Sequence, residues 1–125
     1  MNFEAMNNTK MYFFDKAMEN ERSQLLSIMA DAVSECRIGA DDGSELSYEG
    51  QMGLLRLAEI CCTVKARLGK GGLIVEGTAP EILADIMAQL YSCITQSDFD
   101  DPAGMAVYIE LRYMMEEIMD GEWFE

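Results

Sequence analysis

The side chains of this sequence that are best suited to chemistry include four cysteines. Cys61 and Cys62 are adjacent, while Cys36 and Cys93 stand alone. Structural zinc sites usually pair their cysteines as C-x-x-C, and adjacent side chains on a helix point about 100° apart. The spacing therefore favours cysteines that fill a core, with a metal site as the alternative, and we expect no cofactor.

The chain contains no histidine. Nucleophilic cysteine and serine side chains usually depend on a histidine base, and histidine is also the commonest general acid–base catalyst. The glycines of Gly69-Lys70-Gly71-Gly72 lack the rest of a phosphate-binding loop, because no Ser or Thr follows the lysine. We therefore predict a protein that is not an enzyme.

Spaced carboxylates leave one catalytic alternative open. Glu117 and Asp120 form an E-x-x-D pair, which places both acids on one face of a helix. This pair resembles half of the magnesium site of helical nucleotide pyrophosphohydrolases, which add an E-x-x-E on another helix. No other predicted helix carries an E-x-x-E. A solvated helix face is the favoured interpretation, and a carboxylate, metal-dependent enzyme ranks third among the hypotheses for function.

The charge of the chain restricts its partners. There are 23 acidic residues against 9 basic ones, so the net charge is −14. Such a charge repels nucleic acid and anionic membranes, so we expect neither to bind directly. A basic protein, such as a nucleic-acid-binding enzyme, would be attracted. With no signal-peptide pattern and no apolar run near the ~20 residues of a membrane span, we expect a cytoplasmic protein with reduced thiols.

Acidic residues gather in three clusters, and the last of them adjoins two aromatic residues. We expect the aromatic residues of this tail either to fold back onto the core or to be exposed as anchors. Carboxylates on a rigid scaffold can take the place of phosphates in the basic channel of an enzyme. The predicted partner-binding residues are Asp41, Asp42, Glu45 and Glu49; Asp98, Asp100 and Asp101; and Glu116, Glu117, Asp120, Glu122, Trp123 and Phe124.

These features favour a protein-binding inhibitor or regulator. In size and charge the chain resembles phage-encoded inhibitors of host defence, including anti-CRISPR proteins that block RNA-guided nucleases. The alternative hypothesis is a self-associating structural or accessory domain of a mobile element. A homodimer formed through residues 102–120 and the tail would use Trp123 and Phe124.

The elements that must position these residues are helices. Apolar residues three or four apart predict helices over about 10–37, 48–68, 78–94 and 102–120. Thr78 and Glu81 form a capping box, Asp101-Pro102 starts the last helix, and Gly39 is expected to follow the end of the first. We expect the first helix, long for so small a chain, to be kinked or to project, and the second to be central.

The predicted fold is all-α, with one acidic helical domain over residues 1–125. Short connections favour a compact four-helix arrangement with antiparallel neighbours. A glycine-rich connection joins the second and third helices, and its Leu73-Ile74-Val75 triplet has no obvious strand to pair with. The alternative is an α+β fold with a small hairpin near residues 73–75.

Overall fold

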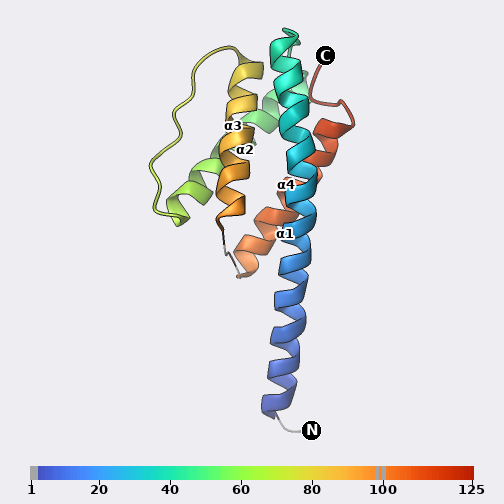
Figure 1. Cartoon of the computed structure of the whole chain (residues 1–125), viewed down its shortest axis with the longest axis vertical. Coiled ribbons are helices and arrows are strands. Elements are labelled where there is room, and N and C mark those ends of the chain that lie inside the picture. Colours follow the sequence, from blue (N-terminus) through green and yellow to red (C-terminus); the bar gives the residue numbers. More distant parts are fainter. Residues whose placement is uncertain (1–2, 98, 100) are drawn as a thin grey trace.

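The protein is described here by a computed structural model, which covers the backbone of residues 3–97, 99 and 101–125 and the side chains from residue 19 within those ranges. No strand occurs in these ranges, so the all-α prediction is confirmed and the alternative hairpin near residues 73–75 is wrong. The helices of the described part are α1 (Phe3–Asp41), α2 (Tyr48–Arg67), α3 (Ala79–Thr95) and α4 (Pro102–Met119) (Figure 1).

Side-chain caps start the last three helices where the sequence breaks its apolar pattern. Thr78 accepts a hydrogen bond from the backbone N–H of Glu81 at 3.4 Å and donates to its carboxylate at 2.9 Å. Asp101 accepts from the N–H of Gly104 at 2.8 Å. Ser47 caps α2 in the same way. These contacts satisfy backbone donors that lack a partner in the first turn, and they confirm the starts predicted at Thr78 and Asp101.

The first helix is longer than its sequence pattern predicts, and its end corrects one prediction. It begins at Phe3 and ends at Asp41, so Gly39 lies within the helix and not after it. The glycine with positive φ beyond the helix is Gly43, with φ of 71°. Gly39 serves another purpose: a Cβ atom there would lie 2.5 Å from the Phe124 ring. The glycine therefore makes room for the tail and does not end the helix.

Helix α1 extends well past the other helices. Its 39 residues correspond to about 58 Å at 1.5 Å per residue. Figure 1 shows its N-terminal part projecting beyond α2, α3 and α4 without a sharp kink. None of the described helices is long and apolar enough to cross a membrane.

Helix α1, and not α2, occupies the centre of the arrangement. It packs against both α3 and α4, whereas α2 packs against α3 and meets α4 only slightly. Consecutive helices thus do not form the closest pairs. The prediction of a central α2 is wrong because the outer face of this helix carries side chains that no other helix covers. Those exposed side chains include Tyr48, Met52, Leu55 and Cys62.

Two polar contacts, the second of them buried, fix how the helices meet. A guanidinium nitrogen of Arg22 on α1 donates to the carbonyls of Ile94 and Thr95 at 3.2 and 2.8 Å, and so caps the C-terminal end of α3. The hydroxyls of Ser97 and Tyr108 lie 2.7 Å apart in the interior. Around them, buried side chains from all four helices form one hydrophobic cluster.

Candidate functional site

The C-terminal tail folds back onto the start of α2. Trp123 is only 1 % exposed, and Phe124 packs partly buried against the core. A Cβ atom on Gly53 would lie 2.2 Å from the Trp123 ring, and one on Gly50 would lie 2.2 Å from the Trp123 carbonyl oxygen. Of the two alternatives for the tail, Trp123 thus takes the folded-back one, in space that two glycines leave on α2.

Backbone hydrogen bonds hold the tail beside the connection between α1 and α2. The N–H of Ser47 donates to the Trp123 carbonyl at 2.9 Å, and the N–H of Glu125 donates to the Glu45 carbonyl at 3.0 Å. The Ser47 hydroxyl donates to the Glu122 carbonyl at 2.5 Å. Between these bonds Leu46 and the tail form an isolated antiparallel bridge. The tail is therefore part of the fold, fixed by both backbone and side-chain contacts.

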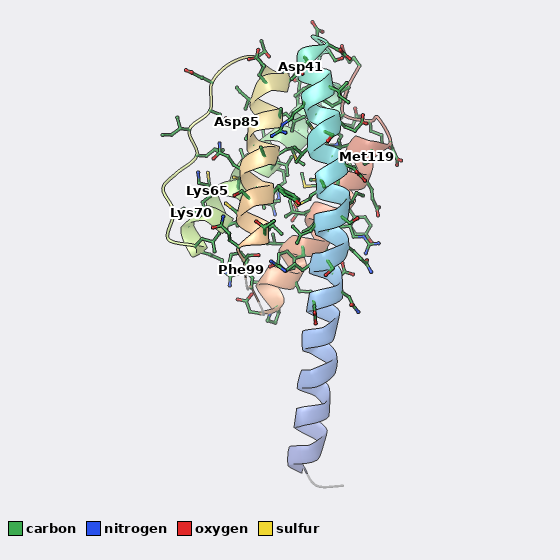
Figure 2. The ribbon with its side chains drawn as sticks, in the orientation of Figure 1. Asp41, Lys65, Lys70, Asp85, Phe99 and Met119 are labelled. Atoms are coloured by element: carbon green, nitrogen blue, oxygen red, sulfur yellow. The ribbon has the colours of Figure 1, made fainter. Side chains whose placement is uncertain are left out.

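This docking unites two acidic clusters that lie far apart in the sequence. The turn after α1 and the end of α4 meet at one end of the helical body, which Figure 2 marks with Asp41. In the described part of the chain, none of these carboxylates forms an ion pair with a Lys or Arg side chain. We call this set the acidic end: Asp41, Asp42, Glu45, Glu49, Glu117, Asp120, Glu122 and Glu125.

The other predicted site residues lie elsewhere. Glu116 faces Arg112, with 3.7 Å between the charged atoms, and so lies outside the acidic end. Asp98 and Asp100 are outside the described residues. Asp101 shares the partner Arg67 with Phe99, and Figure 2 shows Phe99 toward the opposite end of the helical body. The structure therefore separates Asp101, the described member of the middle acidic cluster, from the other two clusters.

Asp101 has a structural role where it lies. A guanidinium nitrogen of Arg67 is 2.8 Å from its carboxylate, and the same guanidinium stacks over the Phe99 ring at 4.1 Å. The N–H of Gly104 and the Arg67 side chain lower the pKa of Asp101 from its usual value of 3.8, because both favour the charged form. This carboxylate is thus occupied within the fold.

An apolar groove of about 440 Å³ lies between α2 and α4, next to the acidic end. Trp123 and Met114 are buried beneath it, while Tyr48 and Tyr113, 71 % and 65 % exposed, stand at its rim with Met52. The groove exists because α2 and α4 meet only slightly. Exposed aromatic and methionine side chains of this kind are typical of surfaces that bind other proteins.

Charged side chains edge this groove. Arg56 binds Glu110 through two hydrogen bonds of 2.5 and 2.7 Å, which raise the pKa of Arg56 and lower that of Glu110. Glu117 accepts a hydrogen bond from the Trp123 indole N–H at 3.1 Å. Glu49 also lines the groove, and it is exposed. The rim therefore has one neutralised ion pair and two carboxylates that remain available to a cation.

The cysteines mostly fill the core. Cys36, Cys61 and Cys93 are buried, which confirms their predicted role, whereas Cys62 is exposed. Burial raises the pKa of Cys36 to about 12 and that of Cys61 to about 11. Both thiols are therefore protonated at neutral pH, and a thiol in that form is a poor nucleophile. Among the described residues no three Cys, Asp or Glu side chains gather as a metal-binding group.

Sequence reasoning missed most of the groove. The sequence pattern does not distinguish Tyr48 and Tyr113, because an exposed tyrosine has no sequence signature of its own. The usable signal was the pair Gly50 and Gly53 inside a helical pattern. Each glycine costs a helix about 1 kcal/mol relative to alanine, so two within one turn indicate that another part of the chain approaches closely.

The comparisons with known proteins assign a family but no activity. By its fold and surface the chain is an all-helical protein with an acidic end and an apolar groove. It belongs to the family described as "Protein of unknown function (DUF3851)", whose model matches residues 1–125. No curated protein matches the chain. No solved structure matches it either.

Proposed function

We propose that this chain is a non-catalytic protein-binding domain that holds a basic, amphipathic segment of a target protein. Its binding surface is the acidic end together with the α2/α4 groove. The observation that carries the proposal is that tail docking brings two distant acidic clusters together, beside an apolar groove, where no described Lys or Arg side chain pairs with them.

The two parts of this surface supply different interactions. The carboxylates of the acidic end attract a basic partner over a distance and accelerate its encounter. The groove then buries an apolar side chain of the partner between Tyr48 and Tyr113, above Trp123. Glu49 and Glu117 lie where they can receive Lys or Arg side chains of the same segment.

A specific form of this proposal is inhibition. A target whose nucleic-acid channel is lined with Lys and Arg would match the acidic end, and binding there would exclude nucleic acid. We propose this role because of the negative charge of the acidic end. Phage-encoded inhibitors of host defence, which this chain resembles in size and charge, are the model for it. Competition supplies its test: added nucleic acid should displace the domain from the target, and simultaneous binding of both would contradict it.

Two variants with the same net charge distinguish an effect of this surface from an effect of the net charge of the whole chain. The first removes four charges from the acidic end: Asp41→Asn, Asp42→Asn, Glu45→Gln and Glu122→Gln. The control removes four charges from exposed positions on α1 and α3: Glu19→Gln, Asp31→Asn, Glu35→Gln and Asp85→Asn.

The probe is a synthetic amphipathic helix with lysines on one face and leucines on the other. Trp123 is the chain's one tryptophan and lines the groove, so its fluorescence reports binding. We expect binding to the wild type and to the control variant, and clearly weaker binding to the acidic-end variant. Equal weakening in both variants would mean that only net charge matters, and would contradict the proposal.

A further inference from the structure

The connection between α2 and α3 contains an extended segment whose side chains alternate. Leu73 and Val75 are partly buried against the core, whereas Ile74 between them is 87 % exposed. Ile74 is the most exposed of the large hydrophobic side chains in the described part of the chain. Alternation with a period of two is the pattern of a β-strand with one face on a core.

The backbone of this segment lacks the partners that a strand requires. From Gly71 to Gly77, no backbone N–H or C=O of the described structure takes part in a backbone–backbone hydrogen bond. Among the described residues, the only hydrogen-bond partner of the segment's backbone is the Lys65 ammonium group, which donates to the Gly72 carbonyl at 3.2 Å. An exposed extended segment of this kind is a ready template for pairing with another strand. Figure 1 shows it running outside the helices, over its whole length.

We propose that this segment pairs with the same segment of a second copy, as a two-stranded antiparallel ribbon centred on Leu73. In this register Leu73 lies opposite Leu73 of the second copy, and Lys70 lies opposite Glu76 of the second copy. Residues directly opposite in an antiparallel pair point to the same face. Both Leu73 side chains therefore point to the same face of the ribbon. Each of them can remain packed against the hydrophobic core of its own copy.

The charges of the segment favour a second copy of this chain as the pairing strand, and they favour a register centred on Leu73. Lys70 and Glu76 form no ion pair within the described chain, and the two-fold symmetry of the ribbon would join them twice. Lys65, Arg67 and Lys70 also make this the most basic stretch of a strongly acidic chain, although Arg67 already pairs with Asp101. Two copies with a charge of −14 each repel one another least where such residues meet.

The outer face of the ribbon also fits this register. Ile74 lies opposite Gly72 of the second copy, where the absence of a side chain leaves space, and the two Ile74 side chains become diagonal neighbours. Such diagonal pairs lie about 7–8 Å apart, within reach of long side chains. The most exposed apolar side chain of the connection thus gains a partner. This inference does not depend on the proposed function, because it uses a different surface.

Charge reversal tests the register directly. We expect the wild type to self-associate with concentration in sedimentation equilibrium. Lys70→Glu and Glu76→Lys should each weaken the dimer about tenfold, because two attractive pairs become repulsive. An equal mixture of these two variants should form a heterodimer as strong as the wild-type dimer, since every cross-strand pair is then opposite in charge. The double variant should recover its own dimer for the same reason.

Matched controls change the same charges on α1, at exposed positions. Arg37→Glu and Glu35→Lys should leave the dimer unchanged, and circular dichroism should show equal helix content in all variants. A wild type that stays monomeric at every concentration would overturn the proposal. So would a dimer that Lys70→Glu and Glu76→Lys leave intact, because another surface, such as the α2/α4 groove, would then hold it together.

Discussion

At one end of the helical body Asp101 caps α4 and pairs with Arg67, whereas at the other end eight carboxylates form no ion pair with a Lys or Arg side chain that the structure describes. The first arrangement uses charge to hold the fold together. In the second, Glu117 accepts a hydrogen bond from the Trp123 indole, but no described Lys or Arg side chain balances the carboxylates, and the repulsion between them opposes folding. The contrast suggests that the acidic end is kept for a partner, and it can be tested by mutation.

The tail creates this contrast, so removing its anchor should have the largest effect. Trp123→Ala removes a buried ring and should lower the free energy of unfolding by about 3–5 kcal/mol. Urea denaturation followed by circular dichroism measures the loss. Leu55→Ala, which truncates an exposed side chain on α2, should change stability by no more than about 0.5 kcal/mol. Equal effects of the two changes would mean that the tail is not docked.

Filling the space beneath Trp123 should have the next largest effect. Gly53→Ala places a methyl group 2.2 Å from the indole ring, and we expect it to cost about 1–3 kcal/mol. In an open helix the same change would stabilise by about 1 kcal/mol. The sign of the change in the urea midpoint therefore decides whether the ring lies there.

Gly71→Ala provides the matched control for the glycine test. No atom lies within 4 Å of a Cβ at this position, and its φ is not positive. We expect an unchanged or slightly higher urea midpoint, because alanine restricts the unfolded chain. A loss as large as that of Gly53→Ala would show that the connection is packed and not open.

At the opposite end of the helical body, Asp101 should make the stability of the protein depend on pH. Asp101→Asn keeps a residue that caps helices well but removes the charge that pairs with Arg67. Since the fold lowers the pKa of Asp101, its carboxylate contributes stability above the usual value of 3.8 and loses this contribution as the pH falls through the folded value. The variant should therefore be less stable at pH 7, and the difference should vanish in acid. Asp42→Asn, without an ion pair, should show no such loss at pH 7.

The smallest expected effect is the change of the melting temperature with salt, which depends on the acidic end. Added salt should raise the melting temperature of the wild type, because it screens repulsion among exposed carboxylates. The acidic-end variant with Asp41, Asp42, Glu45 and Glu122 neutralised should respond less to salt than its control of equal charge. An equal response in both would indicate that the repulsion is spread over the whole surface.

The sequence contained enough information to predict the helices and their caps. Apolar spacing and the residues Thr78 and Asp101 are local signals, so the starts of α3 and α4 could be found without the fold. The end of α1 was placed too early, because Gly39 has the residue type of a helix end. Only the distant Phe124 ring explains why a glycine is needed there.

The candidate site could be predicted only in part. The acidic residues and the tail aromatic residues were found by type, but their meeting depends on contacts such as that between Glu125 and Glu45, which no local pattern records. The same holds for the groove, because it arises where α2 and α4 fail to pack. Long-range packing, and not propensity, decides which helix faces remain uncovered.

Quenching of tryptophan fluorescence tests the central claim most directly, because Trp123 is the chain's single tryptophan and anchors the tail that assembles the acidic end. We predict emission typical of an apolar environment and little quenching by neutral acrylamide in the native protein, with both properties lost in urea. Strong quenching of the native protein, equal to that of the unfolded chain, would show a free tail. The two acidic clusters would then have nothing to hold them together.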